Sequence, residues 1–182
     1  HVPFNNLDAM EKALSSRDAS CVIIETIPAT YGFPLPKPGY LSAVKQLCEK
    51  YGSLYIADEV QTGLMRTGKL WGFEHYSIEP DIFVTSKGLS GGIYPIGATV
   101  VNEKAGNWMN EDGFAHISTF GGAELGCIVA MKVLEISQRK EVVENVGYVA
   151  RYLRSGLETI KNQYPDFFAG IRQLGVVMGL EF

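Results

Sequence analysis

The sequence predicts an α/β fold in which a mostly parallel sheet is flanked by helices. Short apolar runs of strand length alternate along the 182 residues with longer segments of helical spacing. This alternation is typical of parallel strands joined by crossover helices. Several apolar runs also end in an ionisable residue. Because ligands gather beyond the carboxyl ends of such strands, the same pattern indicates where a site would form.

The individual elements follow from the spacing of apolar residues. Residues three or four apart, such as Leu7, Met10 and Leu14, predict a helix, whereas continuous apolar runs predict buried strands. A loop is expected from 28 to 39, where proline and glycine cluster. The expected order is helix 6–15, strand 21–25, helix 40–51, strands 53–57, 80–85 and 95–101, helices 123–137 and 140–162, and a last, unpartnered strand over 171–182.

The length of the chain allows one sizeable domain and a piece of another. We expect residues 1–138 to form part of a large domain. Residues 139–182 are expected to supply a linking helix and the start of a small C-terminal α+β domain.

The composition excludes several classes of protein. A formal net charge of -4 without clustered Lys and Arg argues against nucleic acid as a partner. No apolar run approaches the roughly 20 residues of a membrane span, and no cationic-then-apolar leader is visible. Cys21, Cys48 and Cys127 form no CxxC pair. Their spacing predicts reduced, buried thiols in a cytoplasmic protein.

Ionisable residues follow three successive predicted strands. These residues are Glu25, Asp58 and Lys87. If the strands are neighbours, carboxylate and amine converge on one cavity, and the simplest interpretation of such a pair is a structural ion pair. Two features favour a site instead: glycines follow Lys87 closely, and Val60 and Gln61 add an apolar side chain and an amide just beyond Asp58.

This set of groups suits a flat, phosphorylated heteroaromatic aldehyde. A lysine forms a Schiff base with such an aldehyde. A carboxylate beside the ring nitrogen keeps it protonated, and the protonated ring acts as an electron sink. An apolar side chain can pack on the ring, and an amide can bind its hydroxyl oxygen.

The motifs around these residues resemble those of class III pyridoxal-phosphate-dependent aminotransferases, which are enzymes of fold type I. Residues 54–68 read LYIADEVQTGLMRTG and residues 86–92 read SKGLSGG. Shorter matches extend the resemblance over nearly the whole chain: PDI at 80–82, GYL at 39–41, STFGG at 118–122 and GVVMGLE at 175–181.

The resemblance implies a fold-type-I large domain, with pyridoxal 5'-phosphate as cofactor and Lys87 and Asp58 as catalytic residues. Lys87 matches the Schiff-base lysine, and Asp58 matches the partner of the ring nitrogen. Val60 matches the residue that packs on the ring, and Gln61 the one near its hydroxyl. Thr119 matches a threonine that reaches the cofactor phosphate of the neighbouring subunit, which implies a homodimer or larger oligomer with a shared active site.

Two further positions match the family more loosely. Glu25 matches an acid one layer behind the cofactor, close to Gln61. Arg66 matches an arginine of the signature whose role is more architectural than catalytic. The activity implied is transfer of an amino group between an amine or amino acid and a 2-oxo acid or aldehyde, through the Lys87 Schiff base.

Two other functions remain open from the sequence. Class III relatives include amino-acid racemases and epimerases, which use the same cofactor. A non-catalytic, truncated relative is also possible, although it would have no need of the intact Asp58, Gln61 and Lys87. Family members are longer and carry their phosphate-binding loop upstream of the matched region. The chain is therefore expected to be a fragment of a longer enzyme or a truncated product.

The sequence departs from its relatives at Thr30. Many class III enzymes have an acid there, and in the ornithine and 4-aminobutyrate enzymes it pairs with an arginine that is released when glutamate binds. A threonine cannot form that pair, so a different pair of substrates is expected. A second departure, Ala123-Glu124 in place of Asn-Pro, has no physical explanation that we can offer.

Two rival sites are weaker. Residues 63–69 fit most of a nucleotide-binding loop, but Leu70 stands where a magnesium-binding hydroxyl is needed. The three histidines, His1, His75 and His116, lie far apart with no ligand spacing, so no metal site is expected.

Overall fold

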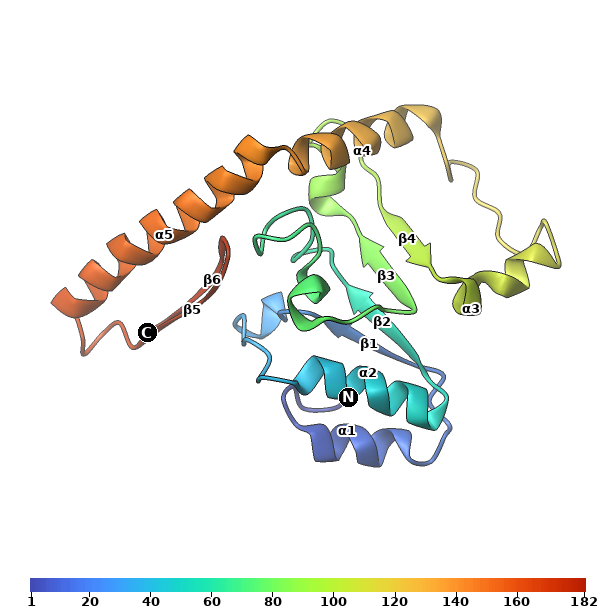
Figure 1. The fold of residues 1–182 in the computed structure, drawn as a ribbon, viewed down its shortest axis with the longest axis horizontal. Helices are drawn as coiled ribbons and strands as arrows, with labels where there is room; N and C mark the ends of the chain where they lie inside the picture. The colour runs from blue at the N-terminus through green and yellow to red at the C-terminus, as the bar shows by residue number, and fades with distance from the viewer.

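The computed structural model describes residues 1–182 and contains two separate sheets (Figure 1). The larger sheet has the strand order β1-β2-β3-β4, with β1 at Cys21–Glu25, β2 at Leu54–Asp58, β3 at Ile82–Thr85 and β4 at Ala98–Val101. The β1–β2 and β2–β3 pairs are parallel, whereas β4 runs antiparallel to β3. The predicted α/β class with a mostly parallel sheet is confirmed.

Helices α1 (Leu7–Leu14) and α2 (Tyr40–Tyr51) lie together on one side of this sheet (Figure 1). The side chain of Asn6 begins α1 by accepting a hydrogen bond from the amide of Ala9. Gly52 ends α2 with a positive φ of 82°. The main core lies between these helices and the sheet and consists of Met10, Leu14, Ile24, Tyr40, Leu41, Val44, Cys48, Tyr55, Ala57, Phe73 and Ile78.

The first strand is buried on one face only. Ile24 is buried, but Cys21 is exposed and the side chain of Ile23 is 64% exposed. The expectation of buried thiols is therefore wrong for Cys21, because alternate residues of a strand point to opposite faces and this face is open. Cys48 is buried in the core, and burial raises its pKa to about 11.

The second half of the chain forms the helices that pass over the ends of β3 and β4 (Figure 1). A short turn η3 (Lys87–Ser90) follows β3, and α3 (Glu103–Gly106) and η4 (Asn107–Asn110) follow β4. Helix α4 (Glu124–Ser137) packs on η3, and α5 (Lys140–Gln163) extends away to one side. No helix in the structure is both long and apolar enough to cross a bilayer.

The C-terminal segment is a hairpin, not the single unpartnered strand expected from its apolar run. Strand β5 (Gly170–Leu174) pairs antiparallel with β6 (Val177–Glu181). Gly175 makes the turn possible, because its φ of 60° lies in the left-handed region that other residues adopt at a cost. The hairpin contacts the rest of the chain through a hydrogen bond from the amide of Val176 to the carbonyl of Arg66, 2.9 Å long.

Candidate active site

The three ionisable residues singled out in the sequence lie at the ends of three adjacent strands. Glu25 is opposite Asp58 in the β1–β2 register, and Asp58 is opposite Val84 in the β2–β3 register. Lys87 begins η3 just beyond the end of β3. The parallel pairing therefore places Glu25, Asp58 and Lys87 on the same side of the sheet, at the carboxyl ends of β1, β2 and β3.

The amine of Lys87 is hydrogen-bonded to the side chain of Gln61. Lys87 Nζ donates to Gln61 Oε1 at 2.5 Å. Both residues line a hollow of about 180 Å³, together with Val60, Leu64 and Arg66 among others. A more open hollow on another side of Lys87 is lined by Ser86, Lys87, Ser90, Pro95, Ile96 and Gly97. Lys87 is the residue common to both hollows.

Lys87 has an unusual backbone conformation. Its φ is +45°, a left-handed value that costs free energy for a residue with a Cβ. The flanking residues hold it in place, since Ser86 Oγ donates to the carbonyl of Ile96 at 3.2 Å. Gly88 follows, where an added Cβ would lie 3.1 Å from Leu64 Cδ1. The glycine after Lys87 thus permits close approach of the loop that carries Leu64.

The remaining predicted residues have other contacts. The carboxylate of Asp58 accepts a hydrogen bond from the amide of Val60 at 3.0 Å, and Asp58 is not among the residues lining either hollow. Glu25 accepts from the amide of Ala29 at 2.9 Å, and the structure contains no hydrogen bond from Glu25 to Gln61. Thr119 is exposed between η4 and α4, outside both hollows.

One residue of this region was not singled out from the sequence. Glu59 is completely buried, with 0% relative exposure, although it directly follows Asp58. Burial raises the pKa of Glu59, and hydrogen bonds from Thr26, Gly72, Thr62 and Phe73 oppose that rise only in part. The adjacent acids Asp58 and Glu59 were a usable signal, because neighbouring residues at a strand end point to opposite sides.

The segment that resembles a nucleotide-binding loop has a different geometry. Leu64 and Met65 both have positive φ, 56° and 67°. An added Cβ on Gly63 would lie 2.9 Å from the ring of Trp71. The segment leads into the short turn η2 (Gly72–Tyr76), not into an α-helix whose N-terminus could face a phosphate. The structure therefore supports a packed turn here.

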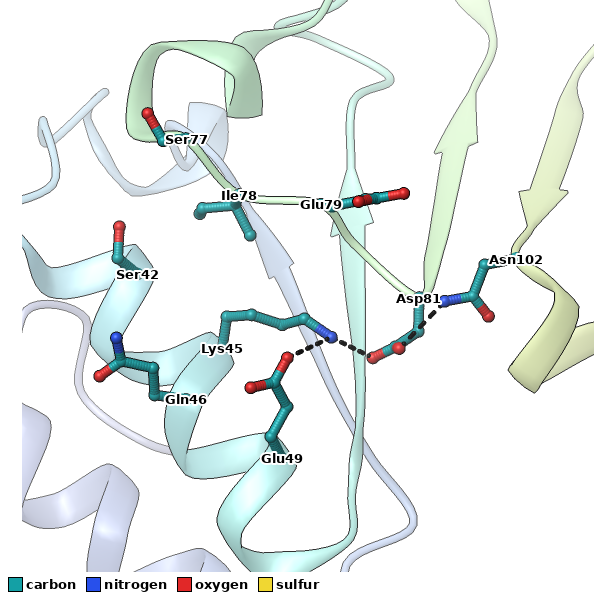
Figure 2. Close-up of a pocket in the computed structure, with 9 residues that line it drawn as sticks. All are labelled: Ser42, Lys45, Gln46, Glu49, Ser77, Ile78, Glu79, Asp81 and Asn102. Carbon is teal, nitrogen blue, oxygen red and sulfur yellow. Dashed lines mark hydrogen bonds and ion pairs between the residues drawn. The ribbon is translucent and has the colours of Figure 1, made fainter.

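The opposite end of β3 has a polar pocket of its own (Figure 2). Lys45 Nζ lies 2.9 Å from the Asp81 carboxylate and 3.3 Å from that of Glu49. Asp81 also accepts from the amide of Tyr55 at 2.8 Å and from Asn102 Nδ2 at 3.2 Å. These groups satisfy one another, which indicates a structural connection between α2, β2 and the start of β3.

Residues 2–182 match the family profile described as Aminotransferase class-III. An uncharacterised aminotransferase of Archaeoglobus fulgidus is 51% identical over 180 residues, which cover 99% of this chain and 42% of that protein. The chain thus spans less than half of the length of that relative.

Two solved structures of similar fold come from other organisms. The ornithine aminotransferase of Plasmodium yoelii is 34% identical with a TM-score of 0.86, and the match covers 100% of this chain and 48% of that one. The acetylornithine aminotransferase of Elizabethkingia anophelis is also 34% identical, with a TM-score of 0.88 over 98% of this chain and 44% of the other.

Proposed function

Because this chain belongs to the class III aminotransferases, we propose that the protein transfers an amino group between an amine or amino acid and a 2-oxo acid or aldehyde, using pyridoxal 5'-phosphate. The observation that carries the proposal is the pairing of the Lys87 amine with Gln61 at the strand end next to Asp58. An amine, an amide and a carboxylate are thereby collected at neighbouring strand ends. This is the set of groups that the cofactor ring requires.

The residues present fit the cofactor that the family implies. Lys87 would hold it through a Schiff base, and Asp58 would pair with the ring nitrogen. Val60, which lines the same hollow as Lys87, would pack on the ring, and Gln61 would bind the ring oxygen. Thr119 is exposed and would serve the phosphate site of a second subunit in a homodimer.

The chemistry divides between the cofactor and the chain. When bound, the cofactor withdraws electrons from the substrate carbon, which makes the proton on that carbon acidic. Lys87 would take up that proton and return it, because its amine lines the hollow and can accept a proton once it is free of the cofactor. Asp58 would keep the ring nitrogen protonated by its negative charge.

We also propose that residues 139–182 begin a smaller domain. Helix α5 leads away from the larger sheet, and β5 and β6 form a sheet of their own. Residues 1–138 would then be the part of the large domain that carries Lys87, Asp58 and Gln61.

The substrate pair is proposed to differ from ornithine or 4-aminobutyrate with 2-oxoglutarate. Thr30 stands where those enzymes carry the acid of their arginine switch, and a threonine hydroxyl cannot form the ion pair. The nearby carboxylate of Glu25 is already bound to the amide of Ala29. A screen of amino donors with 2-oxoglutarate tests this, and efficient turnover of either amine would refute it.

The test of the function is an absorbance titration of the full chain with pyridoxal 5'-phosphate, followed by addition of an amino donor. Wild-type protein should develop the near-visible band of a lysine-linked cofactor, and the donor should change it. The Lys87→Ala variant should lose both the band and turnover. Lys104→Ala, which removes an exposed lysine of α3, should behave as the wild type. Band and turnover that survive in Lys87→Ala would refute the proposal.

A further inference from the structure

We propose that Glu59 is a positioning residue, whose buried carboxylate sets where Asp58 and Gln61 lie relative to Lys87. The inference rests on the proposed function, because the site that Glu59 would position is the cofactor site. It goes beyond that function because Glu59, although it is among the residues that line the hollow beside Lys87, has both carboxylate oxygens bound to donors of the chain itself. Its role would be exerted through its neighbours in the chain.

The carboxylate of Glu59 is held by four donors. Oε1 accepts from Thr26 Oγ1 at 2.5 Å and from the amide of Phe73 at 3.1 Å. Oε2 accepts from Thr62 Oγ1 at 2.9 Å and from the amide of Gly72 at 2.6 Å. These donors come from the segments that follow β1 and β2 and from the turn η2. Glu59 therefore connects three segments of the chain near the carboxyl ends of β1 and β2, where the candidate site lies.

The backbone of Glu59 is fixed as well. Its amide donates to the carbonyl of Val84 in β3 at 2.9 Å, which extends the β2–β3 pairing by one bond. Its carbonyl accepts from the amide of Gly63 at 2.9 Å. Asp58 precedes this fixed residue, and Gln61 lies inside the turn that the second bond closes. Movement of Glu59 would consequently displace both residues.

The surroundings leave little room for movement. An added Cβ on Gly72 would lie 3.0 Å from Thr62 Cβ, 3.1 Å from Glu59 Oε2 and 3.2 Å from Thr26 Cγ2. Glu59 forms no ion pair, so neutral donors alone hold its carboxylate. A carboxylate held only by neutral donors costs free energy to bury, and a fully hydrogen-bonded one fixes the relative positions of the segments that bind it.

The arrangement of donors makes the carboxylate hard to replace. Each oxygen faces one backbone amide and one hydroxyl. A glutamine at position 59 would present an NH2 group to a backbone N–H of Phe73 or Gly72, whichever oxygen the NH2 replaced. Two donors would then face each other, and the loop would have to shift. The shift would pass to Asp58 and Gln61.

The experiment compares Glu59→Gln with Asp81→Asn in the full chain. Asp81 is also a buried carboxylate, but it lies at the opposite end of β3 and outside the site. The affinity for pyridoxal 5'-phosphate is measured from the absorbance band, and the thermal stability of the cofactor-free protein is measured separately. Glu59→Gln is expected to weaken cofactor affinity roughly tenfold to a hundredfold, as misplacement of site residues does. Asp81→Asn should leave the affinity within about twofold even if it melts as early.

Milder variants cover the case in which Glu59→Gln does not fold. Thr26→Val and Thr62→Val each remove one hydroxyl donor while keeping the shape of the side chain. Each is expected to weaken cofactor affinity by about threefold and to lower the melting temperature by only a few degrees, because three of the four donors remain. Wild-type affinity in all three variants would overturn the inference. Equal losses in Glu59→Gln and Asp81→Asn at matched stability would also overturn it.

The proposed function fails by a different result. It fails if Lys87→Ala keeps the absorbance band. The role of Glu59 fails if the band is lost in Lys87→Ala while Glu59→Gln and both threonine variants bind the cofactor as the wild type does.

Discussion

Lys87 donates a hydrogen bond to Gln61, a residue 26 positions earlier in the chain. The contact depends on the parallel pairing of β2 with β3, because the segments that follow two parallel strands leave the sheet at the same end. Since Gln61 also lines the hollow beside Lys87, it connects the amine to the part of the site that follows Asp58.

Replacement of Gln61 tests this contact. Gln61→Ala removes the amide that would bind the ring oxygen of the cofactor, and a hydrogen bond to a charged group is worth about 1.5 to 3 kcal/mol. We expect the affinity for pyridoxal 5'-phosphate to fall at least tenfold, measured by absorbance titration. Gln46→Ala is the matched control, because Gln46 is an exposed glutamine of α2 far from Lys87 in the fold. An unchanged affinity in Gln61→Ala would contradict the role of Gln61.

Removal of Asp81 tests the polar connection at the start of β3. Asp81→Ala removes the acceptor of the amide of Tyr55 and of Asn102, and leaves Lys45 paired with Glu49 alone. We expect the free energy of unfolding to fall by about 3 kcal/mol, because the largely buried amine of Lys45 loses its nearer counterion and a buried amide loses its acceptor. Urea denaturation measures the loss. A change below about 0.5 kcal/mol, as is usual for surface substitutions, would show that the connection contributes nothing.

The same carboxylate predicts a dependence on pH. Burial raises the pKa of Asp81, but hydrogen bonds from Tyr55, Lys45 and Asn102 outweigh it, and the net pKa lies below its ordinary value. A lowered pKa in the folded state stabilises the protein above the pKa of the unfolded chain, roughly 4. That stabilisation is lost as the pH falls through the lowered pKa. Urea denaturation from pH 7 to pH 3 should show the difference between wild type and Asp81→Asn shrinking below about pH 4.

Replacement by alanine should have opposite effects on stability at two glycines, Gly175 in the hairpin turn and Gly156 in α5. In Gly175→Ala, the new Cβ would lie 2.4 Å from the carbonyl carbon of Thr67, and φ is 60°. We expect a loss of about 2 kcal/mol or more in the free energy of unfolding. Gly156→Ala, in the middle of α5 with nothing within 4 Å of the new Cβ, should instead gain up to about 1 kcal/mol. Thermal melts that shift in the same direction for both would refute the assignment of the turn.

Tyr55 offers a substitution that should not destabilise the protein. Its hydroxyl is buried without a hydrogen-bond partner, and burial raises the pKa of Tyr55 well above its ordinary value. Tyr55→Phe removes the unpaired group, so the free energy of unfolding should stay unchanged or rise by about 1 kcal/mol. Tyr51→Phe, which loses a bond to Glu11, is the comparison and should be neutral or slightly destabilising. A loss of more than 1 kcal/mol in Tyr55→Phe would indicate a hidden partner.

The spacing of apolar residues predicted most of the helices and strands. The helix at Tyr40–Tyr51 and the strand at Cys21–Glu25 have the bounds expected from their apolar residues. The prediction of a single strand over residues 171–182 was wrong. The apolar pattern is the same on both sides of Gly175, and only the left-handed φ of that glycine reveals the turn. The antiparallel direction of β4 also could not be predicted, since strand direction depends on the connection and not on composition.

Of the predicted site residues, the structure brings Lys87 and Gln61 into contact, whereas the carboxylates of Asp58 and Glu25 are bound to backbone amides. Asp58, Gln61 and Lys87 could be singled out because they are polar residues at strand ends. Glu59 was missed because its importance lies in donors from Thr26 and Gly72, which are distant in sequence. Two of its four donors are backbone amides, which have no side-chain signature, so the adjacent acids indicate that Glu59 points away from Asp58 but not what it binds.

The strand that leads to Lys87, β3, has only four residues, and both of its ends are bound to neighbouring segments. At its start Asp81 is bound by Lys45 and Asn102, and near its far end the carbonyl of Val84 is bound by the amide of Glu59. A slip of one residue would break both sets of bonds and turn every side chain of β3 to the opposite face. The pairing of β3 with both of its neighbours thus sets where the chain leaves the strand to reach Lys87, and loss of one bond at Asp81 leaves that pairing in place. Insertion or deletion of a single residue between 81 and 87 should abolish the site more completely than most point substitutions within it.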